Sequence, residues 1–179
     1  MTTESVVPEV HHAWAIYLQA SEEARRRGDR RTGTDHLLLA LLEEHSIEVV
    51  LGVSLQQARQ ALESLDHEAL GALGLGSGTD APPLPMRAVP KKPRLRDVAQ
   101  KDRLRITPAA KKVLEEASKP NRRRLQITAP QVLAPILALQ PPDPAAVLLG
   151  ALGVNTSDAL HELASALAQP PDHQTEGRR

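Results

Sequence analysis

The chain has 179 residues, of which 22 are basic and 22 acidic, so its formal net charge is zero and it carries no polyelectrolyte signature. It contains no cysteine, which excludes a disulfide framework, a thiol nucleophile and a cysteine-based zinc site. With 41% hydrophobic residues but one Trp, one Tyr and no Phe, the core must be aliphatic, and this favours helices over strands. No run reaches the ~18 apolar residues of a membrane span, and no basic-then-apolar leader is present. We therefore expect a cytoplasmic protein with no membrane contact.

The first predicted helix follows a short N-terminal segment. Residues 1–7 are expected to be disordered, and Pro8 can begin a helix because proline in the first turn loses no hydrogen bond. Apolar residues keep helical spacing from there to about Arg27. The arginines of residues 25–31 lie beside Glu and Asp side chains, which is typical of a solvated helix end.

A second predicted helix is apolar around almost its whole circumference, which is typical of a buried helix. It follows a polar loop over residues 28–33. Thr34 is the expected cap, and Asp35 lies where the helix dipole favours negative charge. The helix is expected to end near His45.

Two further helices complete the first half of the chain. A short apolar segment over residues 47–51 is ended by Gly52. Ser54 and Gln57 then have the spacing of a capping box, which predicts the start of a fourth helix. Residues 8–70 thus form one predicted unit of four helices.

Residues 71–105 are a predicted linker. Its first part has four Gly and its middle has five Pro, and neither a helix nor a strand can run through such a segment. Residues 87–105 carry eight basic side chains, so this part of the linker is strongly cationic.

The chain then repeats its pattern over residues 106–168. Thr107 and Pro108 predict a capped helix, whose apolar spacing matches that of the first helix. The apolar residues of 132–137 match those of 37–42, and Pro135 is expected to kink or shorten that helix. Residues 152–155 repeat the glycine and polar cap of residues 51–54, so an internal duplication is predicted. The last segment, residues 169–179, is expected to be disordered.

Three stretches carry a resemblance to a known family. Residues 20–25 (A-S-E-E-A-R) with 33–42 (G-T-D-H-L-L-L-A-L-L) resemble the first repeat of the Clp N-terminal domain of ClpA- and ClpC-type unfoldases, and residues 106–115 (I-T-P-A-A-K-K-V-L-E) resemble the opening of its second repeat. The resemblance implies an all-α fold of two pseudo-symmetric four-helix repeats, about eight helices, without the ATPase modules.

The resemblance also implies a function. Clp N-terminal domains dock substrates and adaptor proteins, so we expect a non-enzymatic peptide- or protein-binding module that acts as adaptor, competitor or decoy. Its partners would be a Clp ATPase, its substrates or adaptors, and peptides or cyclic-peptide antibiotics are possible ligands. The expected groove lies between the repeats and is lined by Val10, Trp14, Asp35, His36, Thr107 and Lys111.

Some ClpC members bind phosphorylated arginine, with a Thr and an acid offered by each repeat. Carried over by position, the first repeat has the acid as Asp35 but Val10 in place of the Thr. The second repeat has Thr107 but Pro130 in place of the acid. Each pocket is therefore expected to lack one of its two groups, and Asp35 and Thr107 would cap helices in any case.

No pattern in the chain indicates an enzyme, a cofactor or a metal site. The G-x-x-x-x-G-K-[ST] phosphate loop is absent, and His67 and His161 begin a zinc-protease pattern whose second His is missing. The alternative function is a small nucleic-acid-binding regulator that uses the basic linker. Nucleic acid is disfavoured as a ligand because no aromatic residue is interleaved for base stacking.

Overall fold

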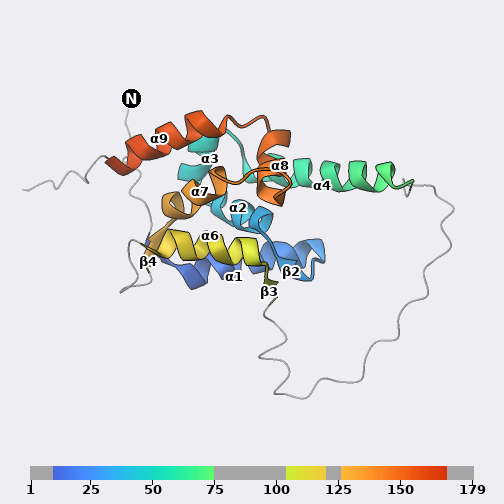
Figure 1. Cartoon of the computed structure of the whole chain (residues 1–179), viewed down its shortest axis with the longest axis horizontal. Coiled ribbons are helices and arrows are strands. Elements are labelled where there is room, and N and C mark those ends of the chain that lie inside the picture. The colour runs from blue at the N-terminus through green and yellow to red at the C-terminus, as the bar shows by residue number, and fades with distance from the viewer. Residues whose placement is uncertain (1–9, 75–103, 120–125, 169–179) are drawn as a thin grey trace, which may run out of the picture.

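The computed structural model describes residues 10–74, 104–119 and 126–168. Within these ranges eight helices make up nearly all of the regular structure, four in each half of the chain, around one aliphatic core (Figure 1). The predicted all-α fold of two related four-helix units is thereby confirmed. None of the described helices is long and apolar enough to cross a membrane.

The two halves contain the same succession of elements. The first half has α1 (Ala13–Arg27), α2 (Thr34–Leu41), α3 (His45–Leu51) and α4 (Leu55–Ala72). The second has α6 (Pro108–Ser118), α7 (Ala129–Leu137), α8 (Pro144–Ala151) and α9 (Thr156–Ala168).

The junction between the third and fourth helix is the same in both halves, as the duplication predicted. Gly52 and Gly153 follow the third helices with φ of 64° and 68°, a left-handed conformation that glycine adopts without a steric penalty. A polar residue then caps the fourth helix. Gln57 N donates to Ser54 Oγ at 3.3 Å, and Ser157 N donates to Asn155 Oδ1 at 3.1 Å.

The helices α2 and α7 form the centre of the fold. Figure 1 shows them in the middle, with α1 and α6 along one side and α9 on the other. Every residue of α2 is buried, and α2 contacts α1, α4, α6, α7 and α8. Burial of so many leucine side chains is the main driving force for this packing, because each contributes roughly 1.5–3 kcal/mol.

Two short strand pairs, which the sequence did not predict, connect the halves. β1 (Val10–His12) pairs antiparallel with β4 (Gln126–Thr128), and β2 (Arg31–Thr32) pairs parallel with β3 (Arg105–Ile106). In both pairs one strand comes from each half. Since β3 leads directly into α6, the second pair places the start of α6 beside the loop that precedes α2.

The beginning of the first helix differs from the prediction. α1 begins at Ala13 rather than near Pro8, because Val10–His12 pairs with β4 instead of continuing the helix. Pro8 lies outside the described residues, as do the predicted N-terminal end, most of the predicted linker with its basic stretch, and the predicted tail.

Both predicted ends of the second helix were wrong. Gly33, not Thr34, is the cap of α2, and the Thr34 hydroxyl donates to Asp143 Oδ1 at 2.6 Å instead. The helix ends at Leu41, and Glu44 is extended and caps a separate α3. The apolar pattern of residues 37–42 continues one residue past the end of the helix because Leu42 is also buried in the core.

Pro135 does not shorten α7, which was one of the two effects expected of it. α7 has nine residues, whereas its counterpart α2 has eight. A proline near the end of a helix removes one hydrogen bond. The neighbouring side chains Val132, Leu133, Ile136 and Leu137 are each at most 2% exposed, and their packing holds the segment helical.

Candidate functional site

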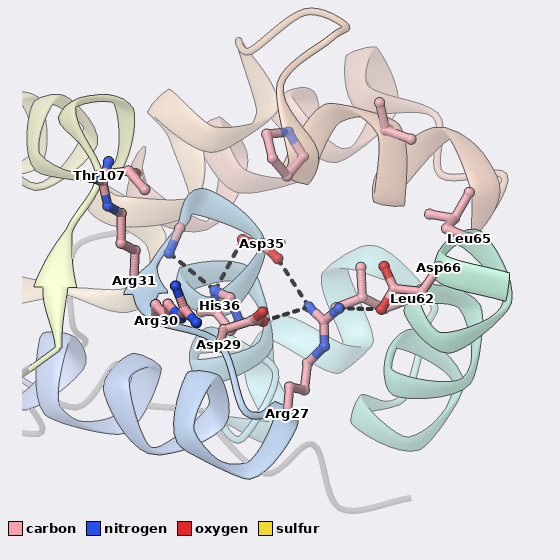
Figure 2. A pocket seen from close by; sticks show the side chains of 13 residues that line it. Arg27, Asp29, Arg30, Arg31, Asp35, His36, Leu62, Leu65, Asp66 and Thr107 are labelled. Atoms are coloured by element: carbon pink, nitrogen blue, oxygen red, sulfur yellow. Dashed lines mark hydrogen bonds and ion pairs between the residues drawn. The ribbon is translucent and has the colours of Figure 1, made fainter. Parts of the chain in front are cut away.

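An open pocket of about 520 Å³ lies where the two halves meet (Figure 2). Its walls come from the end of α1, the following loop, the start of α2, the middle of α4, and the first residues of α6 and α8. It is lined by Arg27, Asp29, Arg30, Arg31, Gly33, Asp35, His36, Leu62, Leu65, Asp66, Thr107, Pro144 and Val147.

The local sequence explains why charged side chains gather here. α1 ends with three arginines, and Gly28 at φ 81° reverses the chain directly after it. The residues that follow lead into β2, which is fixed by its pairing with β3. The charges of this loop are therefore held between α1, α2 and the start of α6.

Arg27 is the centre of an ion-pair network in the pocket. Its guanidinium lies 3.2 Å from Asp35 Oδ2, 3.4 Å from Asp29 Oδ2 and 2.5 Å from Asp66 Oδ2 (Figure 2). The side chain of Arg27 is 19% exposed. One arginine thus contacts three carboxylates, which come from the loop, from α2 and from α4.

His36 links the start of α2 to the same network. The Gly33 backbone N–H donates to His36 Nδ1 at 3.0 Å, and His36 Nε2 lies 2.9 Å from Asp29 Oδ2. A Cβ atom at Gly33 would lie only 2.3 Å from Asp35 Oδ1, so a larger residue here would have to displace the Asp35 carboxylate from the helix start.

The two buried ionisable groups stabilise each other's charged form. Burial alone would raise the pKa of Asp35, but the hydrogen bond and charge of His36, together with the charge of Arg27, lower this pKa below its ordinary value. Burial alone would lower the pKa of His36, but Asp35 and Asp29 outweigh it and raise this pKa. Nδ1 accepts from the Gly33 N–H only while it is unprotonated; when His36 is protonated, Nδ1 instead donates to Asp35 Oδ1, 3.1 Å away.

Two arginines of the pocket form no ion pair with any other residue that the structure describes. Arg30 and Arg31 are exposed, and neither forms an ion pair within the described part of the chain. Thr107 lies next to this loop, because its backbone N–H donates to Thr32 O at 2.9 Å. The Thr107 hydroxyl accepts from Ala110 N at 3.2 Å and so caps α6 at the edge of the pocket.

The structure brings together three of the six predicted site residues. Asp35, His36 and Thr107 all line the pocket. Trp14 is 48% exposed on α1 with its ring centroid 5.0 Å from that of Tyr17, and neither residue lines the pocket.

The other two predicted residues also lie outside the pocket. Lys111 forms an exposed ion pair with Glu115 at 3.5 Å on α6. Val10 lies in β1 opposite Thr128, near the start of α7. The pocket residues that sequence reasoning missed are mainly the arginines of residues 27–31, which the sequence indicated as a solvated helix end.

The phosphoarginine comparison assigned Asp35 and Thr107 to separate pockets, and the structure places them differently. Asp35 of the first half and Thr107 of the second half line one and the same pocket. At the corresponding corner Val10 lies opposite Thr128, and Pro130 is buried at the start of α7. One corner thus has both groups, and the other has neither.

Among the described residues there is no group of three or more His, Cys, Asp or Glu side chains placed to hold a metal ion. His67 and His161, which are both exposed, belong to no such group among these residues.

Comparison with known proteins identifies the fold. No protein-family model matches the chain, and no curated protein matches it either. Among solved structures it is similar to the crystal structure of the N-terminal domain of the caseinolytic protease associated chaperone ClpD from Arabidopsis thaliana, with a TM-score of 0.57. The chain has the fold of a Clp N-terminal domain. The likeness covers 88% of this chain and 95% of the ClpD domain at 18% identity, so it concerns the fold and not the ligand.

Proposed function

We propose that this chain is a non-enzymatic peptide- or protein-binding module of Clp-dependent proteolysis in the cytoplasm, acting as an adaptor, a competitor or a decoy. The observation that carries the proposal is the Clp N-terminal domain fold along 88% of the chain. ClpD, the protein to which the similar domain belongs, is described as a chaperone associated with the caseinolytic protease. A module with this fold would act on the same machinery by binding a substrate, an adaptor or the ATPase itself.

The pocket between the halves is the proposed binding site. Leu62, Leu65 and Val147 supply apolar wall, while Asp35, His36 and Thr107 supply polar groups beside it. A concave surface that combines apolar wall with a few convergent polar groups is typical of a ligand site. Its open shape fits a peptide segment or a cyclic peptide better than a small enclosed ligand.

Val10, Trp14 and Lys111 are proposed as contacts of a longer ligand that extends beyond the pocket. Trp14 and Leu18 are 48% and 44% exposed on α1, one helical turn apart. Exposed aromatic and aliphatic side chains of this kind are common where a protein surface binds a partner.

A degradation assay tests the proposal. A purified Clp unfoldase and its peptidase degrade fluorescently labelled casein while the full chain is added in increasing excess. An adaptor raises the rate, and a competitor or decoy lowers it. An unchanged rate at every concentration, together with no co-purification with the unfoldase or casein, would contradict the proposal.

Two tryptophan variants connect this effect to the pocket. Val147 is 37% exposed and lines the pocket, so Val147→Trp should obstruct it and abolish the effect on the rate. Val49 is 64% exposed on α3 and does not line this pocket, so Val49→Trp is the matched control and should leave the effect unchanged. Equal behaviour of the two variants would place the binding surface elsewhere.

A further inference from the structure

Arg27 forms an ion pair with the Asp35 carboxylate. It therefore takes the position at which a cationic group of a ligand would otherwise bind. We infer that the pocket selects peptides that carry an anionic group, a carboxylate or a phosphate, and that Arg30 and Arg31 bind this group. The inference rests on the proposed function and specifies the class of its ligand.

The first step is that the carboxylates of the pocket are already engaged. Asp35 contacts both Arg27 and His36, and its side chain is only 10% exposed. Asp29 contacts the same two residues, and Asp66 contacts Arg27 at 2.5 Å. A guanidinium or ammonium group that entered the pocket would have to displace Arg27 before it could reach Asp35.

The second step is that the unengaged charges are positive. Arg30 and Arg31 are exposed at the mouth of the pocket, and within the described residues neither has an ion-pair partner. Each guanidinium offers five N–H donors in a planar arrangement that suits carboxylate and phosphate oxygens. The pocket therefore presents two arginines without an ion pair among the described residues, whereas Asp29, Asp35 and Asp66 each contact Arg27.

The third step is that the fold fixes one of these arginines next to a further donor. Arg31 lies opposite Arg105 in the β2–β3 pair, and the following residues place Thr107 N on Thr32 O. Figure 2 shows the Arg31 side chain extended beside Thr107. The Thr107 hydroxyl accepts a bond from Ala110 N, so its hydrogen is available to an anion held by Arg31.

The apolar wall defines the rest of the ligand. Leu62 and Leu65 lie on the other side of Arg27 from Arg31 and Thr107 (Figure 2). A peptide with one acidic side chain close to aliphatic residues can therefore contact the arginines at one end of the pocket and the leucines at the other. The alternative is that Arg30 and Arg31 are ordinary solvated loop residues, in which case the charge of the ligand should not matter.

Fluorescence anisotropy with a set of matched labelled peptides distinguishes these cases. The peptides share leucine-rich flanks and differ at one central position, which is Asp, phosphoserine, Ala or Arg. The full chain is expected to bind the Asp and phosphoserine peptides about fivefold or more tightly than the Ala peptide, and the Arg peptide no more tightly than the Ala peptide.

Charge variants identify the residues responsible. R30Q/R31Q should weaken binding of the Asp peptide about tenfold and remove the preference for it over Ala. The control R25Q/K112Q removes the same charge from exposed positions outside the pocket and should change the affinity less than about twofold. Both variants alter exposed side chains only, so folding is not at risk.

A third variant tests the role of Arg27. R27Q frees Asp35 and should raise the affinity for the Arg peptide about fivefold or more. Because R27Q also removes an internal ion-pair network, its fold is checked by circular dichroism. If it does not fold, D66N replaces it: losing one carboxylate makes the pocket more positive, so D66N should tighten binding of the Asp peptide.

Three results would overturn the inference. The first is a wild-type preference for the Arg peptide over the Asp and phosphoserine peptides. The second is R30Q/R31Q behaving as its control does, with all peptides still bound, in which case the proposed binding function stands without this charge selection. The third is no binding of any peptide and no effect on Clp degradation, in which case the proposed function fails as well.

Discussion

The starts of α2 and α7 are corresponding positions in the two halves of the molecule. Different residues cap the two helices there. In α2 the Gly33 N–H donates to His36 Nδ1 at 3.0 Å, and in α7 the Thr128 N–H donates to Gln131 Oε1 at 3.1 Å. In each case a side chain three residues further along the chain accepts a hydrogen bond from this otherwise unpaired N–H. Capping is therefore what the fold needs at this position.

The surroundings of the two caps differ completely. The start of α2 includes Asp35 within a network of arginines and aspartates. The start of α7 is buried and apolar, with Ala129 and Pro130 at the corresponding place. The charges around α2 are thus not required by the architecture, and this supports assigning the candidate site to the corner at the start of α2 rather than to the one at the start of α7.

The largest effects are expected from the core, where the halves should behave alike. Leu38 and Leu133 are matched positions of α2 and α7, and both are 0% exposed. Leu38→Ala and Leu133→Ala should each lower the free energy of unfolding by about 2–5 kcal/mol, measured by urea denaturation. A cost below about 1 kcal/mol for either variant would show that the two central helices do not share one core.

A pH dependence near neutral pH is expected from His36, in the first half. The raised pKa of His36 means that its contribution to stability is fully present below its ordinary value of 6.5 and is lost as the pH rises through the native pKa. The lowered pKa of Asp35 contributes above its ordinary value of 3.8 and is lost as the pH falls below it. The free energy of unfolding should therefore fall as the pH rises from about 6 to about 8.

Urea titrations at several pH values of wild type and His36→Gln check this dependence. Gln accepts the capping hydrogen bond in α7, so the variant should preserve the helix start while its pH dependence becomes flatter. His161, which is exposed on α9, provides the control His161→Gln. Identical pH profiles for wild type and His36→Gln would show that His36 does not cause the pH dependence of the free energy of unfolding.

A smaller loss is expected at the cap of α6. Thr107→Val removes the hydrogen bond from Ala110 N to Thr107 Oγ1, and the loss of an N-cap typically costs about 1 kcal/mol. Thermal denaturation should show a lower melting temperature. If Thr107 also contacts an anion, the variant should bind the Asp peptide more weakly than its stability loss explains.

The smallest effect has the opposite sign and lies in the second half. Thr128 Oγ1 is buried without a hydrogen-bond partner among the described residues. Thr128→Val removes this unpaired hydroxyl at nearly constant volume and should raise the free energy of unfolding by up to about 1 kcal/mol. If Thr128→Val instead destabilised the protein as much as Thr107→Val, the Thr128 hydroxyl would have the same capping role as the Thr107 hydroxyl.

Local signals in the sequence predicted most of the fold. The apolar spacing of α2, the Ser54–Gln57 capping box and the glycine after α3 each depend on residues within a few positions of one another, so they can be recognised without a structure. The β1–β4 and β2–β3 pairs could not be predicted this way. Strands of two or three residues form only because the packed halves bring them together.

The site was predicted in part for the same reason. Asp35, His36 and Thr107 were recognised from local motifs and the resemblance they carry, and all three line the pocket. The role of Arg27 depends on Asp66, which lies 39 positions further along the chain. No local pattern connects residues at that separation.

Chemical-shift mapping of the ¹⁵N-labelled full chain with the Asp peptide tests the central claim, that the binding site lies at the start of α2 and not at the start of α7, most directly. The expected changes lie at residues 27–36, at 62–66 and around Thr107, while residues 127–133 stay unchanged. Equal changes at the starts of α2 and α7, or changes confined to the start of α7, would contradict it.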